Sequence, residues 1–402
     1  MRRVVLRKGR EDSLRRFHPW IFSGAVASVE GNPYEGEAVE VISHDGCFLA
    51  VGHWQKGSIA VRVLSFGQEF MPYDNGMMPR EFWVDRLSRA MRLRRSLEFK
   101  DTTCYRLVHG EGDSLPGLVV DIYGEVAVMQ AHAAGMYISA GNIADALMEC
   151  SGGTVRAVYN KSMGTAPHRA GLNLQDGYLT GPYRSDEEVV MENGHRFIVN
   201  WAAGQKTGFF LDQRDNRALV GSFSTGRRVL NLFCYTGGFS VYALNRGAAS
   251  VVSVDSSAVA VDMLRRNVEL NIGADDASAR HRAECADALD YLRDVKAGDF
   301  DLMVVDPPAF AKHRDALDNA LRAYRRLNAA AIAKVAHGGL VFTYSCSQAV
   351  DRKAFELTVF SAAAQTGRSV RILRRLTQPA DHPVNIYHPE GDYLKGLLLY
   401  VE

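Results

Sequence analysis

The sequence predicts an α/β protein with a small β-rich domain, an α+β domain, and a carboxyl-terminal domain built on a doubly wound parallel sheet. Three observations predict the third domain. From Phe197 onward, strand-like and helix-like segments alternate to the end of the chain. Several of these strands are almost wholly apolar, as strands buried on both faces are. A glycine turn follows the first of them, where such sheets bind ligands.

Length and composition limit the class of protein. A chain of 402 residues suits two or three domains, and 47% hydrophobic with 23% charged residues is typical of a globular protein. No apolar run reaches the roughly 18 residues of a membrane span, and the Arg-rich start lacks the apolar segment of a signal peptide. The six cysteines show no metal-ligand spacing. We therefore expect a cytoplasmic protein with free thiols, no membrane segment and no metal site.

The distribution of charge along the chain is more informative than the net charge. The net charge of +1 does not indicate a nucleic-acid partner, but basic residues cluster in four stretches. Such clusters can contact phosphates, although a solvated helix face is the more frequent explanation of each one. The four stretches are Arg2–Arg10, Arg86–Lys100, Lys312–Arg326 and Arg368–Arg375.

The first two domains are predicted from short periodic segments. Residues 1–72 alternate β-branched runs with glycine turns, and residues 71–80 carry two prolines and a glycine, as a linker does. Residues 80–190 mix helical and alternating patterns. The predicted strands are 38–42, 47–52, 59–64, 105–109, 117–123, 126–131 and 155–160, and the predicted helices are 81–99 and 136–150.

The third domain is predicted to span residues 196–402, and its centre is the stretch from Arg227 to Asp255. A strand there is followed by the turn Tyr235-Thr236-Gly237-Gly238, a helix and a second strand that ends on Asp255. An acid in that position can accept hydrogen bonds from ribose hydroxyls. The turn is not G-x-G-x-x-G, which favours a nucleoside-type cofactor over a dinucleotide, with a purely structural turn as the alternative. Strands are predicted at 228–233, 250–255, 279–284, 300–306, 339–345, 370–376 and 394–401.

Polar residues follow several of these strands. Asp255 ends the second strand, Asp287 follows the third and Asp306 the fourth. Because carboxyl ends of parallel strands share one edge, these side chains are expected to meet there. Each acid has an alternative role as a helix cap, which Asp255 and Asp287 suit well.

The residues at two strand ends, Asp306 and Cys346, are candidates for catalysis. Asp306 precedes two prolines, which end the strand and stiffen the backbone, so its carboxylate is fixed where it can accept from a planar substrate. Cys346 lies between two serines after an apolar strand and becomes a nucleophile once ionised. A buried structural thiol is the commoner role of a lone cysteine. Cys234, in the glycine turn, is the rival thiol.

The segment Ala203–Arg217 combines glycines, aromatics and charges. Asp212 is predicted to cap a helix in which Arg214 and Arg217 share a face. Arg214 could bind a carboxylate, and Gln213 could hydrogen-bond to a backbone group or to the ligand. We interpret the segment as a wall of the cofactor pocket, with a hairpin packed on the sheet as the alternative.

These residues resemble a known family. The chain carries, in order, GQKTGFFLDQRDNR, LFCYTGGFS, DPPAF and YSCS. Together they resemble the bacterial S-adenosylmethionine-dependent cytosine-C5 methyltransferases that act on large-subunit (23S) ribosomal RNA. HPWIFSGAV resembles the opening of that family's PUA RNA-binding domain, RLVHGEGDSLPGLVVDIYG its central domain, and DHPVNIYHPEGDYLKGLLL its carboxyl end.

The resemblance implies a Rossmann-like (class I) methyltransferase fold, S-adenosyl-L-methionine as cofactor and ribosomal RNA as partner, with a homodimer possible. It implies Cys346 and Asp306 as catalytic residues. The thiolate would add to cytosine C6, C5 would attack the methyl group, and an unnamed base would remove the C5 proton. The implied cofactor-binding residues are Phe210, Gln213, Arg214, Asn231, Phe233, Tyr235, Thr236, Gly237, Asp255, Ser256, Asp287, Ala288, Asp306 and Pro307.

One departure and three alternatives remain. Relatives commonly carry Lys after the double proline, where this chain has Ala309. An RNA methyltransferase acting on another atom, such as guanine N2, would leave Cys346 structural. A non-catalytic RNA-binding protein would retain only the cofactor fold. An NAD-dependent oxidoreductase is disfavoured by the incomplete phosphate fingerprint.

Overall fold

The computed structural model describes residues 2–182, 185–310 and 316–402. Contacts divide the chain into two compact units. Unit 1 comprises residues 1–190, 199–211 and 380–391, and unit 2 comprises residues 191–198, 212–379 and 392–402. Lys312, the start of one basic stretch, lies outside the described residues. The division into domains 1–72, 80–190 and 196–402 stays a prediction.

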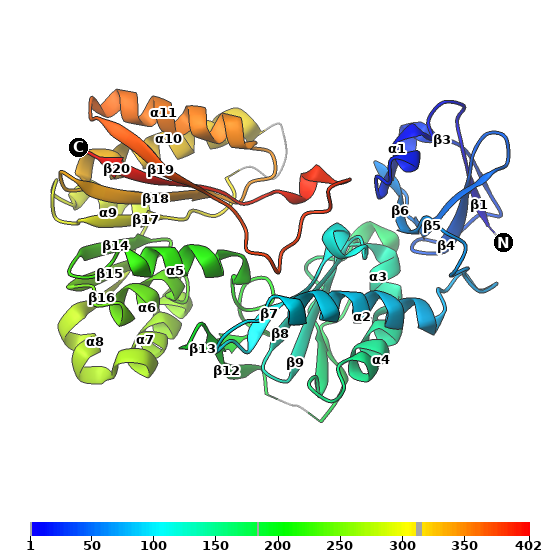
Figure 1. Cartoon of the computed structure of the whole chain (residues 1–402), viewed down its shortest axis with the longest axis horizontal. Coiled ribbons are helices and arrows are strands. Elements are labelled where there is room, and N and C mark those ends of the chain that lie inside the picture. The colour runs from blue at the N-terminus through cyan, green and yellow to red at the C-terminus, as the bar shows by residue number, and fades with distance from the viewer. Residues whose placement is uncertain (1, 183–184, 311–315) are drawn as a thin grey trace. The chain divides into compact units, whose positions relative to one another are not determined.

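Unit 1 begins with a six-stranded sheet in the order β2-β6-β5-β4-β1-β3 (Figure 1). The strand at 38–42 forms as predicted, whereas the next is displaced and runs from Phe48 to Trp54. Alternating side chains such as Val39 and Val41 are fully buried, which explains the strand periodicity. The elements are β1 (Arg3–Leu6), α1 (Asp12–Arg15), β2 (Trp20–Phe22), β3 (Val26–Glu30), β4 (Ala38–Ile42), β5 (Phe48–Trp54) and β6 (Ile59–Ser65).

A second, five-stranded sheet of unit 1 has the order β11-β10-β9-β8-β7. The single helix expected at 136–150 is two helices that meet at Ser139. In the first of them Gly135 packs so closely on His53 that an added Cβ would lie 2.2 Å from the imidazole ring. The elements are α2 (Arg80–Ser96), β7 (Cys104–His109), β8 (Leu118–Tyr123), β9 (Val126–Ala131), α3 (Ala134–Ile138), α4 (Ala140–Cys150), β10 (Ala157–Asn160) and β11 (Gly177–Thr180).

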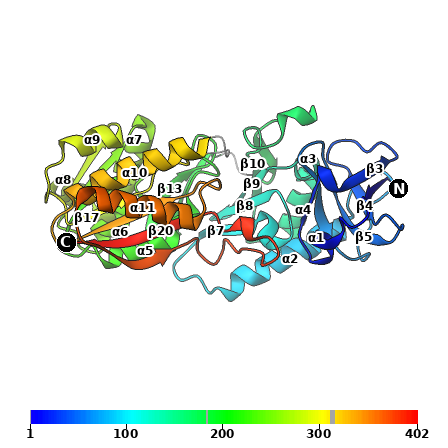
Figure 2. The same cartoon turned by 90° about the horizontal axis from the view of Figure 1, so that it is seen from above.

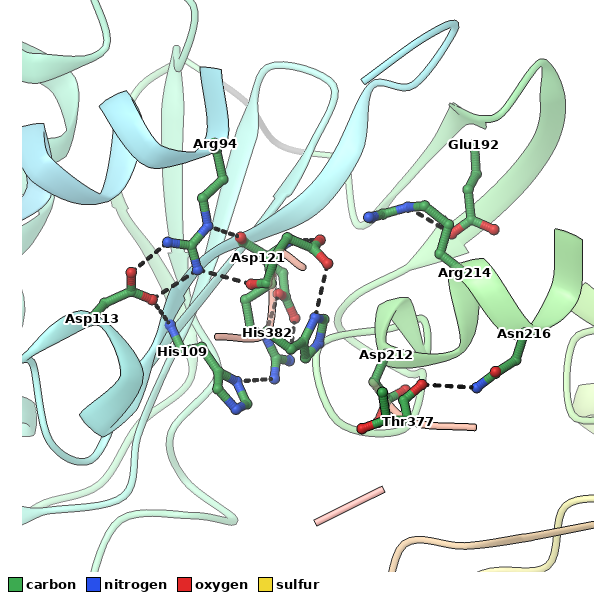
Figure 3. Close-up of polar contacts among 12 residues, drawn as sticks. Arg94, His109, Asp113, Asp121, Glu192, Asp212, Arg214, Asn216, Thr377 and His382 are labelled. Atoms are coloured by element: carbon green, nitrogen blue, oxygen red, sulfur yellow. Dashed lines mark hydrogen bonds and ion pairs between the residues drawn. The ribbon is translucent and has the colours of Figure 1, made fainter. Parts of the chain in front are cut away.

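The segment 380–391 returns from the carboxyl-terminal part of the sequence to unit 1. Arg94 forms a buried ion pair with Asp113 and donates a 2.8 Å hydrogen bond to the Asp381 carbonyl oxygen. The Asp381 carboxylate accepts from the Arg106 backbone N–H, and His382 lies 3.1 Å from Asp381 (Figure 3). Buried charge pairs of this kind are costly to break, so they hold in place a segment whose large apolar side chains, such as Ile386 and Tyr387, are exposed.

Unit 2 is a seven-stranded sheet in the order β16-β15-β14-β17-β18-β20-β19. The first five strands of this order run parallel to one another. Strand β20 pairs antiparallel with β18 on one side and with β19 on the other. The strand expected at 279–284 starts only at His281, because helix α8 continues to Arg280. The strands are β14 (Arg228–Leu232), β15 (Ser250–Asp255), β16 (His281–Cys285), β17 (Leu302–Val305), β18 (Gly339–Ser345), β19 (Val370–Leu376) and β20 (Lys395–Val401).

Helices of unit 2 form two groups. Helices α6 and α7 pack on β15 and α5 packs on α6, whereas α10 packs against α9 and α11. Both views show α10 and α11 side by side (Figures 1 and 2). The helices are α5 (Arg214–Ser222), α6 (Gly238–Asn245), α7 (Ala258–Ile272), α8 (Ala274–Arg280), α9 (Ala288–Asp294), α10 (Leu317–Lys334) and α11 (Arg352–Thr366).

The arrangement confirms the predicted doubly wound α/β sheet. Its strand order reverses between β14 and β17, the place where such sheets bind ligands. A short hairpin of β12 (Glu187–Glu192) and β13 (His195–Asn200) precedes it. None of the described helices is both long and apolar enough to cross a membrane.

Candidate functional site

The site residues of unit 2 gather at one edge of its sheet. Leu232 of β14 pairs with Val254 of β15 and with Val305 of β17, so the residues after these strands lie level with one another. Val305 in turn pairs with Thr343 of β18. The glycine turn, Asp255, Asp306 and Cys346 therefore follow neighbouring parallel strands at their carboxyl ends, as the sequence predicted.

The turn after β14 has an uncommon backbone. Phe233, Tyr235 and Gly237 have positive φ angles of 58°, 47° and 88°, a region that non-glycine residues rarely occupy. At Gly237 an added Cβ would lie 2.1 Å from the Leu264 Cδ1 atom, so only glycine fits. Strained turns of this kind cluster at ligand sites.

Asp255 holds this turn and does not serve as the N-cap of α7, the alternative role that the sequence left open. Its Oδ2 accepts a 2.9 Å hydrogen bond from the Tyr235 N–H and its Oδ1 accepts one from the Ser257 N–H. Ser257 is the N-cap of α7. Asp287 does cap α9, accepting from the N–H groups of Leu289 and Asp290. Its exposed carboxylate stands at the same edge of the sheet.

The carboxylate of Asp306 is oriented by Gln213. The Gln213 side-chain amide donates a 3.0 Å hydrogen bond to Asp306 Oδ2, and its oxygen accepts a 2.6 Å bond from Asn216. Asn216 also donates to the Thr377 carbonyl oxygen (Figure 3). Gln213 thus contacts a carboxylate, whereas the sequence suggested a backbone or ligand group.

Cys346 is half-buried directly after β18. The preceding Ser345 hydroxyl donates a 3.0 Å hydrogen bond to the phenol oxygen of Tyr324 on α10. The Lys395 ammonium donates a 2.7 Å hydrogen bond to the Ser347 carbonyl oxygen, one residue beyond the thiol. Burial lowers the pKa of Lys395 to about 8, partly offset by nearby Cys346.

Cys234 has a different environment. It is buried under the glycine turn. Burial raises the pKa of the Cys234 thiol well above its usual value, and the Asp255 carboxylate raises it further. Cys234 is therefore poorly suited to form a thiolate.

Arg214 and Arg217 share a helix face, as predicted, and both point at Glu192. Arg217 makes two hydrogen bonds to the Glu192 carboxylate, of 2.8 and 2.6 Å. The Arg214 Nε atom lies 3.6 Å from Glu192 Oε2 (Figure 3). All three side chains are nearly inaccessible to solvent. The N-cap residue of α5 is Gln213 rather than the predicted Asp212, whose Oδ2 accepts a 2.6 Å bond from the Tyr393 hydroxyl.

The remaining implied site residues are placed as follows. Phe210 belongs to segment 199–211 of unit 1, where the Lys206 ammonium lies 4.6 Å from its ring centroid. Ser256 is exposed at the end of β15, whereas Ala288 and Pro307 are buried behind Asp287 and Asp306. No described group of three or more His, Cys, Asp or Glu side chains has the arrangement of a metal site.

Sequence reasoning missed Glu192 and Lys395. Glu192 ends the strand Glu187–Glu192, whose acidic and apolar residues do not alternate, so no periodicity indicated that this acid points inward. Lys395 stands alone in an apolar run, Leu394–Val401, which is a usable signal because a lysine is seldom buried without a reason.

Comparison with known proteins gives family matches for most of the chain. The family described as S-adenosylmethionine-dependent methyltransferase matches residues 168–399, and the one described as PUA-like domain matches residues 4–66. A protein of Shewanella amazonensis named ribosomal RNA large subunit methyltransferase I is 40% identical over 99% of each chain.

Solved structures share the fold. A structure provisionally described as a SAM-dependent methyltransferase from Streptococcus mutans superimposes with a TM-score of 0.82 at 22% identity over 100% of both chains. Another, provisionally described as a methyltransferase complexed with SAH, has a TM-score of 0.84 at 22% identity over 100% of both chains. At this identity the likeness concerns the fold alone.

Proposed function

Because the chain belongs to the S-adenosylmethionine-dependent methyltransferase family, we propose that it methylates C5 of a cytosine in large-subunit ribosomal RNA, with Cys346 as nucleophile. The observation that carries this proposal is the position of Cys346. It follows β18, beside the strand that delivers Asp306 and at the same edge as the glycine turn.

The residues at the carboxyl ends of β14, β15 and β16 fit the cofactor. Asn231 Oδ1 and Thr236 Oγ1 are buried polar atoms without a hydrogen-bond partner among the described residues. Such atoms are costly unless a ligand satisfies them. The tight turn brings backbone close to any ligand, and Asp255 and Asp287 offer carboxylates to hydroxyl groups. S-adenosylmethionine, when bound, supplies an electrophilic methyl group.

Cytosine C5 is a weak nucleophile, and addition of Cys346 to the ring would make it a stronger one. Its thiolate forms a bond to C6, and the electron pair of the C5=C6 bond moves toward C5 and N3. Asp306, held by Gln213, donates a hydrogen bond to N3 from its protonated carboxyl group and so stabilises the negative charge that develops there. Once C5 carries the methyl group, a base takes the C5 proton, the C5=C6 bond re-forms, and the thiolate leaves.

The proposed substrate follows from the relatives and from the chemistry. The Shewanella amazonensis relative is named for large-subunit ribosomal RNA. A thiolate reaches C6 only when the base leaves its stack, and bases in loops and single strands of RNA leave it readily.

The test is methyl transfer to an unmodified large-subunit ribosomal RNA transcript, followed by nucleoside analysis. Wild type should form 5-methylcytidine and Cys346→Ala should form none. Cys285→Ala removes an exposed thiol at the end of β16, at the same edge of the sheet, and serves as the matched control with full activity.

Three results contradict the proposal. If Cys346→Ala stays active, or another methylated nucleoside such as a guanine N2 product appears, Cys346 is structural. Saturable S-adenosylmethionine binding by wild type without transfer to any RNA indicates a binding protein. A transcript substituted with 5-fluorocytidine gives an independent readout, because fluorine cannot leave as the C5 proton does and the Cys346 adduct should persist.

A further inference from the structure

Several exposed arginines of unit 2 have a carboxylate beside them, both on its helices and on its sheet. These pairs are Arg228–Asp301, Arg265–Asp262, Arg282–Glu284, Arg293–Asp290, Arg371–Glu402 and Arg375–Glu356.

Within the described part of the chain, three neighbouring arginines of α10 have no such partner. Arg322, Arg325 and Arg326 are exposed, and no carboxylate of the described residues forms an ion pair with any of them. Positions three and four apart lie on one helix face, so the three guanidinium groups share the same side of α10. Only Arg322 has a side-chain partner there, the amide oxygen of Asn319.

These arginines line a groove of about 810 Å³ between α10 and the end of α11. Four alanines of α10, including Ala329 and Ala330, contribute small side chains, and Gln365 and Thr366 of α11 contribute polar ones. The groove therefore combines open space with unneutralised positive charge. Like charges brought together repel, so their free energy falls when a polyanion binds.

The partner chemistry follows from the lining. Protein interfaces are anchored by buried aromatic and large aliphatic side chains, and this groove has none. Guanidinium groups, by contrast, bind phosphates with paired hydrogen bonds. The lining thus suits a phosphate backbone better than an acidic protein surface.

The groove also lies on the helix that leaves the candidate site. Helix α10 follows β17, whose end carries Asp306. At about 1.5 Å per residue, Arg322 and Arg326 lie roughly 8 and 14 Å along the axis from Leu317, the first residue of α10. A nucleic-acid strand is long enough to cover both places.

We propose that the groove between α10 and α11 binds backbone phosphates of the RNA substrate. This inference rests on the proposed function for the identity of the polymer, but not on the position of the methyl group or on Cys346. Arg322, Arg325 and Arg326 supply affinity, and none of them takes part in the chemistry.

The test compares two triple variants with the same change in net charge. In one, Arg322, Arg325 and Arg326 become Gln. In the matched control, Arg265, Arg280 and Arg293, each paired with a carboxylate, become Gln. Affinity for an unmodified large-subunit ribosomal RNA transcript is measured over a range of salt concentrations. S-adenosylmethionine binding by calorimetry reports that each variant is folded.

We expect the groove variant to bind RNA at least about tenfold more weakly, with the slope of log affinity against log salt reduced by about 2, and the control to change little. Equal losses in both variants, or none in the groove variant, would overturn the proposal, and the second result would leave an acidic protein as the partner. Loss of RNA binding together with a product other than 5-methylcytidine would support the groove while refuting the proposed reaction.

Discussion

Helices α5 and α10 carry arginines at similar spacing in opposite environments. Arg214 and Arg217 of α5 are buried and turn to Glu192. Arg322 and Arg326 of α10 are exposed and line an open groove. Burial alone would lower the pKa of Arg217, but the Glu192 carboxylate outweighs it and raises the pKa.

The difference shows that the partner determines what an arginine does. A guanidinium that is desolvated and paired holds the fold together, and removing its carboxylate leaves a buried charge uncompensated. A guanidinium without a carboxylate adds little to stability and is available to a ligand. Four changes test this comparison, and their expected effects decrease in the order given.

The largest effect is expected from Glu192→Gln. Two buried arginines would lose their common counter-charge, so the free energy of unfolding should fall by about 3–5 kcal/mol. Urea denaturation measured by circular dichroism checks this. A loss below about 1 kcal/mol would mean that groups other than Glu192 neutralise Arg214 and Arg217. The buried arginines of α5 would then not depend on one carboxylate, and the contrast with α10 would fail.

Lys395 is an intermediate case, a buried cation held by a carbonyl oxygen. Its pKa of about 8, lowered by burial, means that the ammonium is charged below that pH and neutral above it. Its charge is also affected by Cys346, Asp392, Arg352 and Asp351. A positive charge favours a nearby thiolate.

We therefore expect Lys395→Met to slow alkylation of Cys346 by iodoacetamide about tenfold at about pH 7. The rates of wild type and variant should converge above about pH 9, where wild-type Lys395 has lost its charge. Mass spectrometry of the Cys346 peptide gives the rate, and Cys285 in the same digest is the control. A constant ratio at every pH would assign Lys395 a structural role only.

A smaller effect is expected when a carboxylate is introduced into the groove between α10 and α11. Ala330→Glu places an acid four residues after Arg326, where the two side chains can pair. RNA affinity should fall about three- to tenfold, while the melting temperature stays within about 2 °C. Unchanged RNA affinity would indicate that phosphates do not contact this face. Ala330→Gln is the uncharged control.

The smallest effect is expected from Glu356→Gln. Its partner Arg375 is largely exposed, so solvent screens the 2.7 Å ion pair. The free energy of unfolding should change by less than about 1 kcal/mol, measured as for Glu192→Gln. A change as large as that at Glu192 would remove the distinction between buried and exposed pairs.

Much of the carboxyl-terminal fold and the position of its site could be predicted from local sequence. Apolar runs marked β14, β15 and β18, because strands buried on both faces need them. Glycines and prolines marked the ends of β14 and β17, because they stop strands. Parallel strands then place Asp255, Asp306 and Cys346 at one edge, whatever the details of packing.

The tertiary structure alone decided which distant residues join them. Lys395 reaches the peptide beyond Cys346 because β20 returns antiparallel to β18, with Ser345 paired to Lys395. Glu192 meets Arg217 across 25 positions, and Asp381 meets Arg94 across 287. Periodicity and turn chemistry act over a few neighbouring residues. Register and burial between distant segments arise only when the chain packs, and they determined the partners of Lys395, Glu192 and Arg94.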